Sequence, residues 1–141
     1  MLLFDVNVLL AAHRADHPDH DVAAAELGAA TRGDEPFTVP AFVWASLLRL
    51  ATNRRVFGVP SSLDDVFTFI DAVIGQRGFV AAEPGARHLP LVRQACADAG
   101  ASGNLVPDAV LAAMAVELGA TVVSFDHDFD RFRVRHRRPG G

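Results

Sequence analysis

Lysine is missing from this chain, and all 13 of its basic residues are arginine. Any mechanism that needs a lysine ammonium group is therefore excluded. The net charge at pH 7 is −4, so the overall field of the molecule does not favour nucleic acid. If the chain binds nucleic acid, it must do so through local patches of positive charge.

Cysteine and long apolar runs are also scarce. Cys96 is the one cysteine, so an internal disulfide is impossible, and we expect it to be a small core residue. No apolar run approaches the roughly 18 residues of a membrane span. No basic segment or cleavage-site pattern precedes the first apolar run, which argues against a secretory signal. We therefore expect a cytoplasmic protein with no membrane association.

Segments with strand and helix patterns alternate along the chain. Strands are predicted at 2–6, 37–39, 79–81, 121–124 and 133–136. Helices are predicted at 8–12, 20–31, 40–50, 63–74, 88–99 and 108–118. Strands that alternate with helices of about a dozen residues indicate βαβ units. The sequence therefore predicts a single α/β domain over residues 1–141, with α/β/α layers around a mostly parallel sheet of four to five strands.

Three aspartates lie at the edges of these predicted elements. Asp5 follows the first apolar run, Asp108 opens a helix, and Asp126 closes the strand before it. Parallel sheets bind ligands outside the carboxyl ends of their strands, so we expect the three carboxylates in one crevice. Gathered carboxylates repel one another, and a divalent cation relieves that repulsion. The pattern therefore favours a metal-dependent enzyme.

Helix capping is the alternative interpretation of each acid, because Asp and Asn are favoured at helix starts. Asn7 either caps a helix or orients a ligand or water beside Asp5. The segment that starts at Asp126 has acids at alternating positions, more than one cap needs. Asp126 is the best ligand candidate in it and Asp128 the second, in a supporting role.

Arginines gather in two places. Arg49, Arg54 and Arg55 lie at the end of the third predicted helix, and five more arginines occupy residues 131–138. The guanidinium group is well suited to phosphates, so the first cluster is a candidate for binding phosphate groups, with Arg49 foremost. A solvated helix end is the alternative. For the C-terminal stretch, a solvated tail is the favoured interpretation.

Four segments together resemble a known family. They are 3–10 (Leu-Phe-Asp-Val-Asn-Val-Leu-Leu), 48–53 (Leu-Arg-Leu-Ala-Thr-Asn), 106–113 (Val-Pro-Asp-Ala-Val-Leu-Ala-Ala) and 122–129 (Val-Val-Ser-Phe-Asp-His-Asp-Phe). In this order and spacing the chain resembles the PIN domain, in the form of a VapC-type toxin of a bacterial toxin–antitoxin pair. The resemblance covers nearly the full chain.

This resemblance implies an activity and partners. PIN domains of this type are Mg²⁺- or Mn²⁺-dependent endoribonucleases, usually homodimers, which a cognate VapB-type antitoxin holds inactive. By position, Asp5, Asp108 and Asp126 match the metal-site acids of the family. The helices around 42–50 and 63–74 are candidate docking surfaces for the antitoxin because they are rich in aromatics, although we expect most of these aromatics to fill the chain's own core. These aromatics are Phe42, Trp44, Phe67 and Phe69.

The chain departs from the family at one place. PIN proteins commonly supply another acid, often Glu, from the helix that here contains Trp44 and Ser46. No acid occurs between Pro40 and Asp64. A second interpretation is therefore a catalytically weakened PIN-like module that binds RNA and antitoxin. An aspartyl-phosphate phosphatase and a phospho-receiver fit less well, because Asn7 replaces the phosphatase's second acid and the receiver's lysine is missing.

Overall fold

A parallel sheet of four strands runs through the middle of the chain in this computed structural model, which describes all 141 residues. The strand order is β2-β1-β3-β4, and every neighbouring pair is parallel. The strands are β1 (Leu2–Phe4), β2 (Phe37–Thr38), β3 (Thr121–Val123) and β4 (Arg135–Arg137). The predicted mostly parallel α/β sheet is confirmed.

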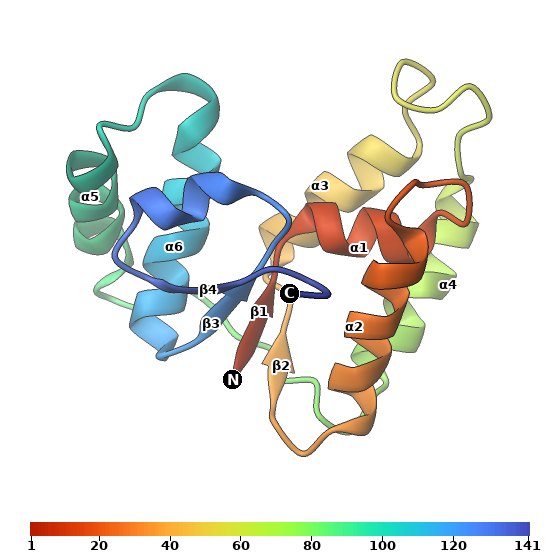
Figure 1. Cartoon of the computed structure of the whole chain (residues 1–141), viewed down its shortest axis with the longest axis horizontal. Coiled ribbons are helices and arrows are strands. Elements are labelled where there is room, and N and C mark those ends of the chain that lie inside the picture. The colour runs from red at the N-terminus through yellow and green to blue at the C-terminus, as the bar shows by residue number, and fades with distance from the viewer.

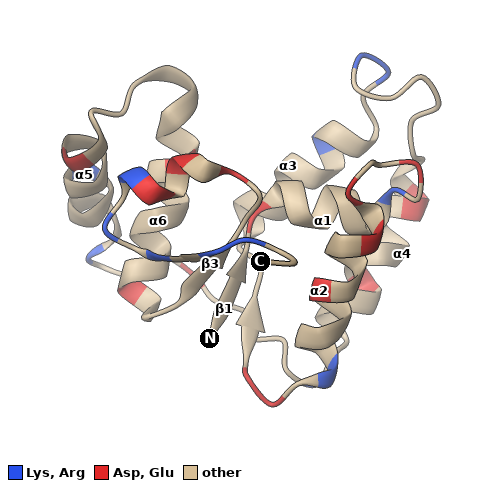
Figure 2. Ribbon diagram, in the orientation of Figure 1, with Lys and Arg blue, Asp and Glu red and all other residues tan.

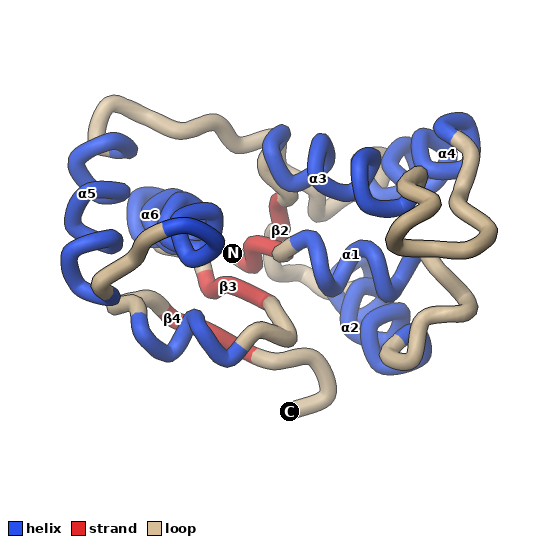
Figure 3. Tube along the Cα trace, turned by 90° about the horizontal axis from the view of Figure 1, so that it is seen from above, coloured by secondary structure: helices blue, strands red, loops and turns tan.

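Six α-helices surround this sheet. They are α1 (Val6–His13), α2 (His20–Arg32), α3 (Ala41–Ala51), α4 (Leu63–Ile74), α5 (His88–Ala99) and α6 (Val106–Leu118). Seen along the strands, α5 and α6 lie on one side of the sheet, α1 and α2 lie on the other, and α3 and α4 lie beside α1 (Figure 3). Two short 3₁₀ helices, η1 (Gly103–Leu105) and η2 (His127–Arg131), precede α6 and β4. None of the helices combines the length and the apolar character that crossing a bilayer requires.

The central strand β1 is apolar throughout because helices cover both faces of the sheet. Its residues Leu2, Leu3 and Phe4 are buried, and Leu3 pairs with Thr38 on one side and Val122 on the other. The side chains of successive strand residues point to opposite faces, so each of these positions enters one of the two apolar layers. Residues 2–4 therefore anchor the start of the chain at the centre of the core.

The observed strands are mostly shorter than predicted. The first ends at Phe4 rather than at residue 6, and β2 and β3 each end one residue before the predicted end. The strand expected at 79–81 is reduced to one bridge, in which Phe79 pairs with Phe37. Strand β2 is only two residues long, so it offers little backbone for a fifth strand to pair with. The last strand begins at Arg135, two residues after its predicted start.

The strand order reverses between β1 and β3, which lie side by side at the centre of the sheet (Figure 1). Strand β1 connects onward to β2 on one side, whereas β3 connects to β4 on the other side. In open α/β sheets, ligands bind at the carboxyl ends of the two strands where the order reverses in this way. Asp5 follows β1 and Ser124 follows β3, so both lie at this point.

Helix α6 brings a third polar residue to the same end. Its buried residues Leu111 and Met114 hold it against the core. Gly119 ends the helix with a left-handed backbone, φ 64°, which glycine adopts without strain. The helix begins at Val106, two residues before the predicted start, and Asp108 therefore lies in its first turn.

Candidate metal centre

A cleft at the carboxyl ends of β1 and β3 collects most of the acids expected there. Its walls come from the start of α1, from α3, from the start of α6 and from the turn after β3. Its volume is about 190 Å³, enough for a cation with several waters. The residues that line it are Asp5, Val6, Asn7, Phe42, Val43, Ser46, Pro107, Asp108, Leu111 and Asp126.

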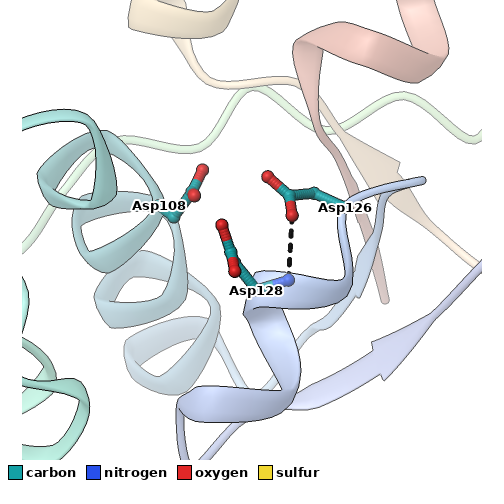
Figure 4. A group of neighbouring side chains, drawn as sticks. All are labelled: Asp108, Asp126 and Asp128. Atoms are coloured by element: carbon teal, nitrogen blue, oxygen red, sulfur yellow. Dashed lines mark hydrogen bonds between the residues drawn. The ribbon is translucent and has the colours of Figure 1, made fainter.

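Three carboxylates converge beside this cleft. Asp108 extends from the first turn of α6 towards Asp126 and Asp128, which lie on the turn into η2 (Figure 4). One carboxylate oxygen from each of the three lies within 4.8 Å of the others. The backbone amide of Asp128 donates to Asp126 Oδ1 at 2.8 Å, which holds the second carboxylate over the start of η2. Asp128, which was expected in a supporting role, thus belongs to the same carboxylate cluster as Asp108 and Asp126.

Asp5 lines the same cleft but is not part of that 4.8 Å cluster. It is the N-cap of α1, and its Oδ1 accepts from the amide of Val6 at 2.7 Å. Its Oδ2 accepts from the hydroxyl of Ser124 at 2.8 Å. Each oxygen keeps a further lone pair, so this aspartate both caps a helix and presents a carboxylate to the cleft.

Ser124 joins the two central strands at this end, a role that its local sequence does not indicate. Its buried hydroxyl donates to Asp5 and accepts from the side-chain amide of Asn7 and the backbone amide of Asp126, both at 3.0 Å. One donor and two acceptor sites are all that a hydroxyl has, so the group is fully satisfied. The carboxamide oxygen of Asn7 also accepts from the amide of Phe125 at 3.2 Å.

Two acids of the cleft, Asp108 and Asp5, have a raised pKa. Burial, reinforced by Asp5, Asp126 and Asp128, raises the pKa of Asp108 from 3.8 to about 7. Burial also raises the pKa of Asp5, although hydrogen bonds from Ser124 and Val6 oppose this shift. No cationic group is close enough to Asp108 to offset the three neighbouring carboxylates. Asp108 also accepts no hydrogen bond from the protein.

This donor set fits a divalent cation. The free oxygens belong to carboxylates, the ligands that Mg²⁺ and Mn²⁺ prefer, and the open cleft leaves room for water in the remaining positions. No histidine or cysteine belongs to the cluster, so a zinc site is not favoured. A cation here would compensate the repulsion that raises the pKa of Asp108.

Helix α3 contributes no acid to the cleft. Of the two residues considered for the place of the usual helix acid, Ser46 lines the cleft and Trp44 does not. The hydroxyl of Ser46 donates to the backbone oxygen of Phe42 at 3.1 Å. Trp44 instead packs, partly buried, against the core. The α3 wall of the cleft is therefore neutral.

The arginines expected to bind RNA lie on the α3 side. Arg49, Arg54 and Arg55 are exposed, and none of them forms an ion pair. Arg49 lies one turn beyond Ser46, on the part of the helix that leads away from the cleft. Figure 2 shows these basic residues on α3 and its following loop, and a second group along β4.

The C-terminal arginines are more ordered than a solvated tail. Arg137 pairs with Glu26, and Arg131 donates to the backbone oxygen of Ala99 at 2.8 Å. Arg138 contacts the ring of His127. The tail expected to be solvated is thus tied to α2, to the end of α5 and to η2.

Most of the aromatic residues on α3 and α4 belong to the chain's own core. Phe42, Trp44 and Phe69 are partly buried against it. Phe67, in contrast, is 47% exposed, beside the exposed Leu63 on α4.

The chain belongs to the PIN domain family, which matches residues 2–134. It is similar to Ribonuclease VapC25 of Mycobacterium tuberculosis (strain ATCC 25618 / H37Rv), with 55% identity over 140 residues that cover 99% of each protein. Ribonuclease VapC43 of the same organism is 43% identical over 140 residues, which cover 99% of this chain and 95% of that protein. The resemblance inferred from the four sequence segments is confirmed.

Solved structures share the fold. VapBC2 from Rickettsia felis, bound to a DNA fragment from its promoter, matches with a TM-score of 0.71 and 15% identity, over 97% of each chain. VapC20 of Mycobacterium tuberculosis, a Sarcin-Ricin loop cleaving toxin, matches with a TM-score of 0.64 and 16% identity, over 92% of this chain and 93% of that one. At these identities the likeness establishes a common fold.

The raised pKa of Asp108 predicts that Asp108→Asn stabilises the metal-free protein, and more at pH 8 than at pH 5. The pKa of Asp108 is about 7 in the folded protein, against 3.8 for a free aspartate. The folded state is therefore favoured while Asp108 is protonated, and this contribution to the free energy of unfolding is lost as the pH rises from about 4 through 7. Solvent screens this half-buried group, so we expect a gain on the order of 1 kcal/mol at pH 8, or roughly 3 °C in Tm.

Thermal melts in EDTA at pH 5 and pH 8 check this prediction. Burial lowers the pKa of His13, so the contribution of His13 to the free energy of unfolding increases as the pH rises, opposite to that of Asp108. It is common to both proteins, so the difference between variant and wild type removes it. Asp71→Asn, at an exposed position on α4, is the matched control. Equal melting shifts for Asp108→Asn at both pH values would contradict the predicted coupling.

Proposed function

We propose that this chain is the toxin component of a type II toxin–antitoxin system and a metal-dependent endoribonuclease that hydrolyses RNA phosphodiester bonds. The observation that carries the proposal is the convergence of Asp108, Asp126 and Asp128 beside Asp5, with no arginine paired to any of them. The relatives at 55% and 43% identity are ribonucleases. In this proposal residues 1–141 form a single PIN domain, and its carboxylates supply the metal ligands that RNA hydrolysis needs.

The acids have distinct tasks in the proposed reaction. Asp5, Asp108 and Asp126 would hold Mg²⁺, or alternatively Mn²⁺, with Asp128 in support. When bound, the cation would neutralise charge that develops on the phosphodiester and lower the pKa of an attacking water. Ser124 and Asn7 keep the carboxylate of Asp5 and the turn before Asp126 in place. In-line hydrolysis would leave a 5′-phosphate.

The RNA backbone is proposed to approach the acids from the α3 side. Arg49, Arg54 and Arg55 are exposed and lack acidic partners, so their charge is available to phosphates. The neutral wall at Ser46 does not repel a phosphodiester, whereas the acids opposite need a cation before they can accept one. Base preference would come from loops rather than from these arginines.

A VapB-type antitoxin is the proposed partner, because solved VapBC complexes share this fold. Apolar surface on α4 is available for it: Leu63 is 57% exposed, Phe67 47% and Ile74 42%. A second apolar feature is a groove between α1, α2 and α4, lined by Leu27, Phe69 and other residues. The cytoplasm is the proposed compartment, because RNA is the substrate and Cys96 has no disulfide partner.

A catalytically weakened PIN-like module remains the second candidate function. The observation that favours it is Ser46, which leaves the cleft without an acid from α3. Such a module would bind RNA and antitoxin without cutting. Ser46→Glu would then create cleavage that the wild type lacks, whereas in an active nuclease it alters a rate that is already present.

Replacement of one cleft acid should abolish cleavage while leaving the fold intact. Asp5→Asn and Asp108→Asn are each expected to lower the cleavage rate at least about 100-fold, because the cation loses a charged ligand. Purified variants are incubated with structured RNA and Mg²⁺, with EDTA as the metal-free control, and 5′ ends are sequenced. Purified antitoxin at an equimolar ratio should suppress the wild-type reaction.

Asp71→Asn serves as the matched control because it removes an exposed carboxylate from α4, away from the cleft. Circular dichroism checks that each variant is folded. Cleavage by Asp5→Asn at the wild-type rate would exclude the proposed role of that residue. If the wild-type protein leaves the RNA uncut in both Mg²⁺ and Mn²⁺, the catalytically weakened module is favoured instead.

Loss of Arg49 should weaken RNA binding through charge alone. Each guanidinium that contacts a single-stranded RNA phosphate contributes about 0.7 to the slope of log affinity against log salt concentration. We expect Arg49→Ala to reduce that slope by roughly this amount. Fluorescence anisotropy with the Asp5→Asn background, which does not cut the probe, measures it. Arg32→Ala, at the opposite end of the sheet, should keep the slope; an unchanged slope in Arg49→Ala would refute the contact.

A homodimer is proposed to form through the face of α5 and α6. A groove there is mostly apolar and is lined by Leu91, Ala112 and Val116 among others, and the nearby Leu89 is 70% exposed. Val116→Asp should therefore convert a dimer to a monomer in light scattering, since it puts a charge into a buried apolar contact. Val59→Asp, at an exposed residue of the loop before α4, is the control. A dimer that survives Val116→Asp would exclude this face.

A further inference from the structure

His136 lies beneath the candidate metal centre, and the proposed reaction does not use it. It stands in the middle of β4 and its side chain is only 7% exposed. Its Nε2 is 3.1 Å from the backbone oxygen of Ser124, and its Nδ1 is 3.3 Å from a carboxylate oxygen of Asp130. The ring also packs against Phe129, with centroids 5.5 Å apart.

Both neighbours of the ring are acceptors. A backbone carbonyl and a carboxylate cannot donate, so each ring nitrogen must donate its own hydrogen for both bonds to form. Through this one side chain β4 is therefore bonded to both Ser124 and Asp130. Hydrogen bonds depend on direction, whereas the packing of an apolar ring does not.

The two partners of His136 lie at the ends of the segment that carries two of the acids. Ser124, at the start, binds Asp5 and the amide of Asp126 through its hydroxyl. Asp130, at the end, lies in η2 two residues after Asp128. Bonds at both ends restrict how residues 124–130 move relative to β4.

We propose that His136 is a positioning residue that sets where Asp126 and Asp128 stand opposite Asp108, and thereby the affinity of the cleft for a divalent cation. This inference rests on the metal centre of the proposed function. It assigns to β4 a part in that centre although β4 supplies no ligand. Groups that orient ligands from behind typically change metal affinity 10–100-fold when they are removed.

The sign of the effect separates positioning from simple electrostatics. Any positive charge on the ring of His136 would repel a nearby cation, so a purely electrostatic effect of removing the ring would strengthen metal binding. Loss of positioning would weaken it. His136→Phe removes both ring nitrogens, and so both hydrogen bonds, while it keeps a ring against Phe129. His136→Gln keeps a donor that can reach the oxygen of Ser124.

Mn²⁺ binding tests the proposal directly, with the metal alone as the probe. Isothermal titration calorimetry at pH 7.5, at a temperature well below the Tm of each variant, gives the dissociation constants for Mn²⁺. We expect His136→Phe to weaken Mn²⁺ binding about tenfold or more, and His136→Gln to bind clearly more tightly than His136→Phe. Hydrogen exchange of the metal-free proteins should show faster exchange in residues 124–130 for His136→Phe, with α1 unchanged.

His20→Phe is the matched control, because the ring of His20 also bonds a backbone oxygen, that of Ala11 at 2.8 Å, away from the cleft. It should leave Mn²⁺ affinity unchanged. If His136→Phe does not fold, His136→Met replaces it, since it fills space without a donor. Unchanged or tighter Mn²⁺ binding in these donor-free variants overturns the proposal, as does equal binding by the Gln and Phe variants.

The outcomes also distinguish this inference from the proposed function. A wild type that binds Mn²⁺ with the expected dependence on His136 but cuts no RNA would refute the nuclease and leave the positioning role standing. A wild type that cuts RNA while His136→Phe keeps full Mn²⁺ affinity would refute the positioning role alone. A wild type that binds no Mn²⁺ overturns both.

Discussion

The hydrogen bond from the hydroxyl of Ser124 to the carboxylate of Asp5, 2.8 Å long, is the interaction on which the candidate site depends. Asp5 is only 9% exposed, and a carboxylate removed from water costs several kcal/mol unless hydrogen bonds compensate it. Ser124 supplies such a bond from the end of β3 to the end of β1, and the same hydroxyl accepts a hydrogen bond from the backbone amide of Asp126. The acid that follows β1 and the acid that follows β3 are thus held by a single side chain.

The remaining electrostatics of the cleft oppose stability. Burial, together with three neighbouring carboxylates, raises the pKa of Asp108 to about 7, so near neutral pH the metal-free protein keeps a proton there or bears the repulsion. Evolution often retains such unfavourable arrangements at functional sites, where a ligand relieves them. Capping alone does not account for Asp108, because α6 begins at Val106 and the carboxylate accepts no hydrogen bond. The cost is explained if a cation is the intended neighbour.

The sequence allowed the sheet and three of the acids to be predicted because their signals are local. The uninterrupted apolar run before Asp5, the left-handed cap at Gly119 and the acids after β3 each reflect nearby residues. Ser124 and His136 could not be assigned roles in this way. Ser124 contacts Asp5 from 119 positions away, and His136 contacts Ser124 from 12 positions away, so both roles arise only from the parallel pairing of the strands. The strand expected at 79–81 was wrong for a related reason, because the short partner β2 decides how much pairing is possible.

The distribution of charge around the cleft is asymmetric, and this asymmetry has a consequence for substrate approach. Acids occupy the α6 and η2 side together with the end of β1, whereas α3 presents Ser46 and, one turn further, Arg49. A cation would be drawn to the acidic side, because that is where the uncompensated charge lies. A phosphodiester that approached along α3 would then meet no carboxylate on that helix. The missing helix acid therefore leaves one wall open to an anion, and any metal binding would fall to the segment that Ser124 and His136 hold in place.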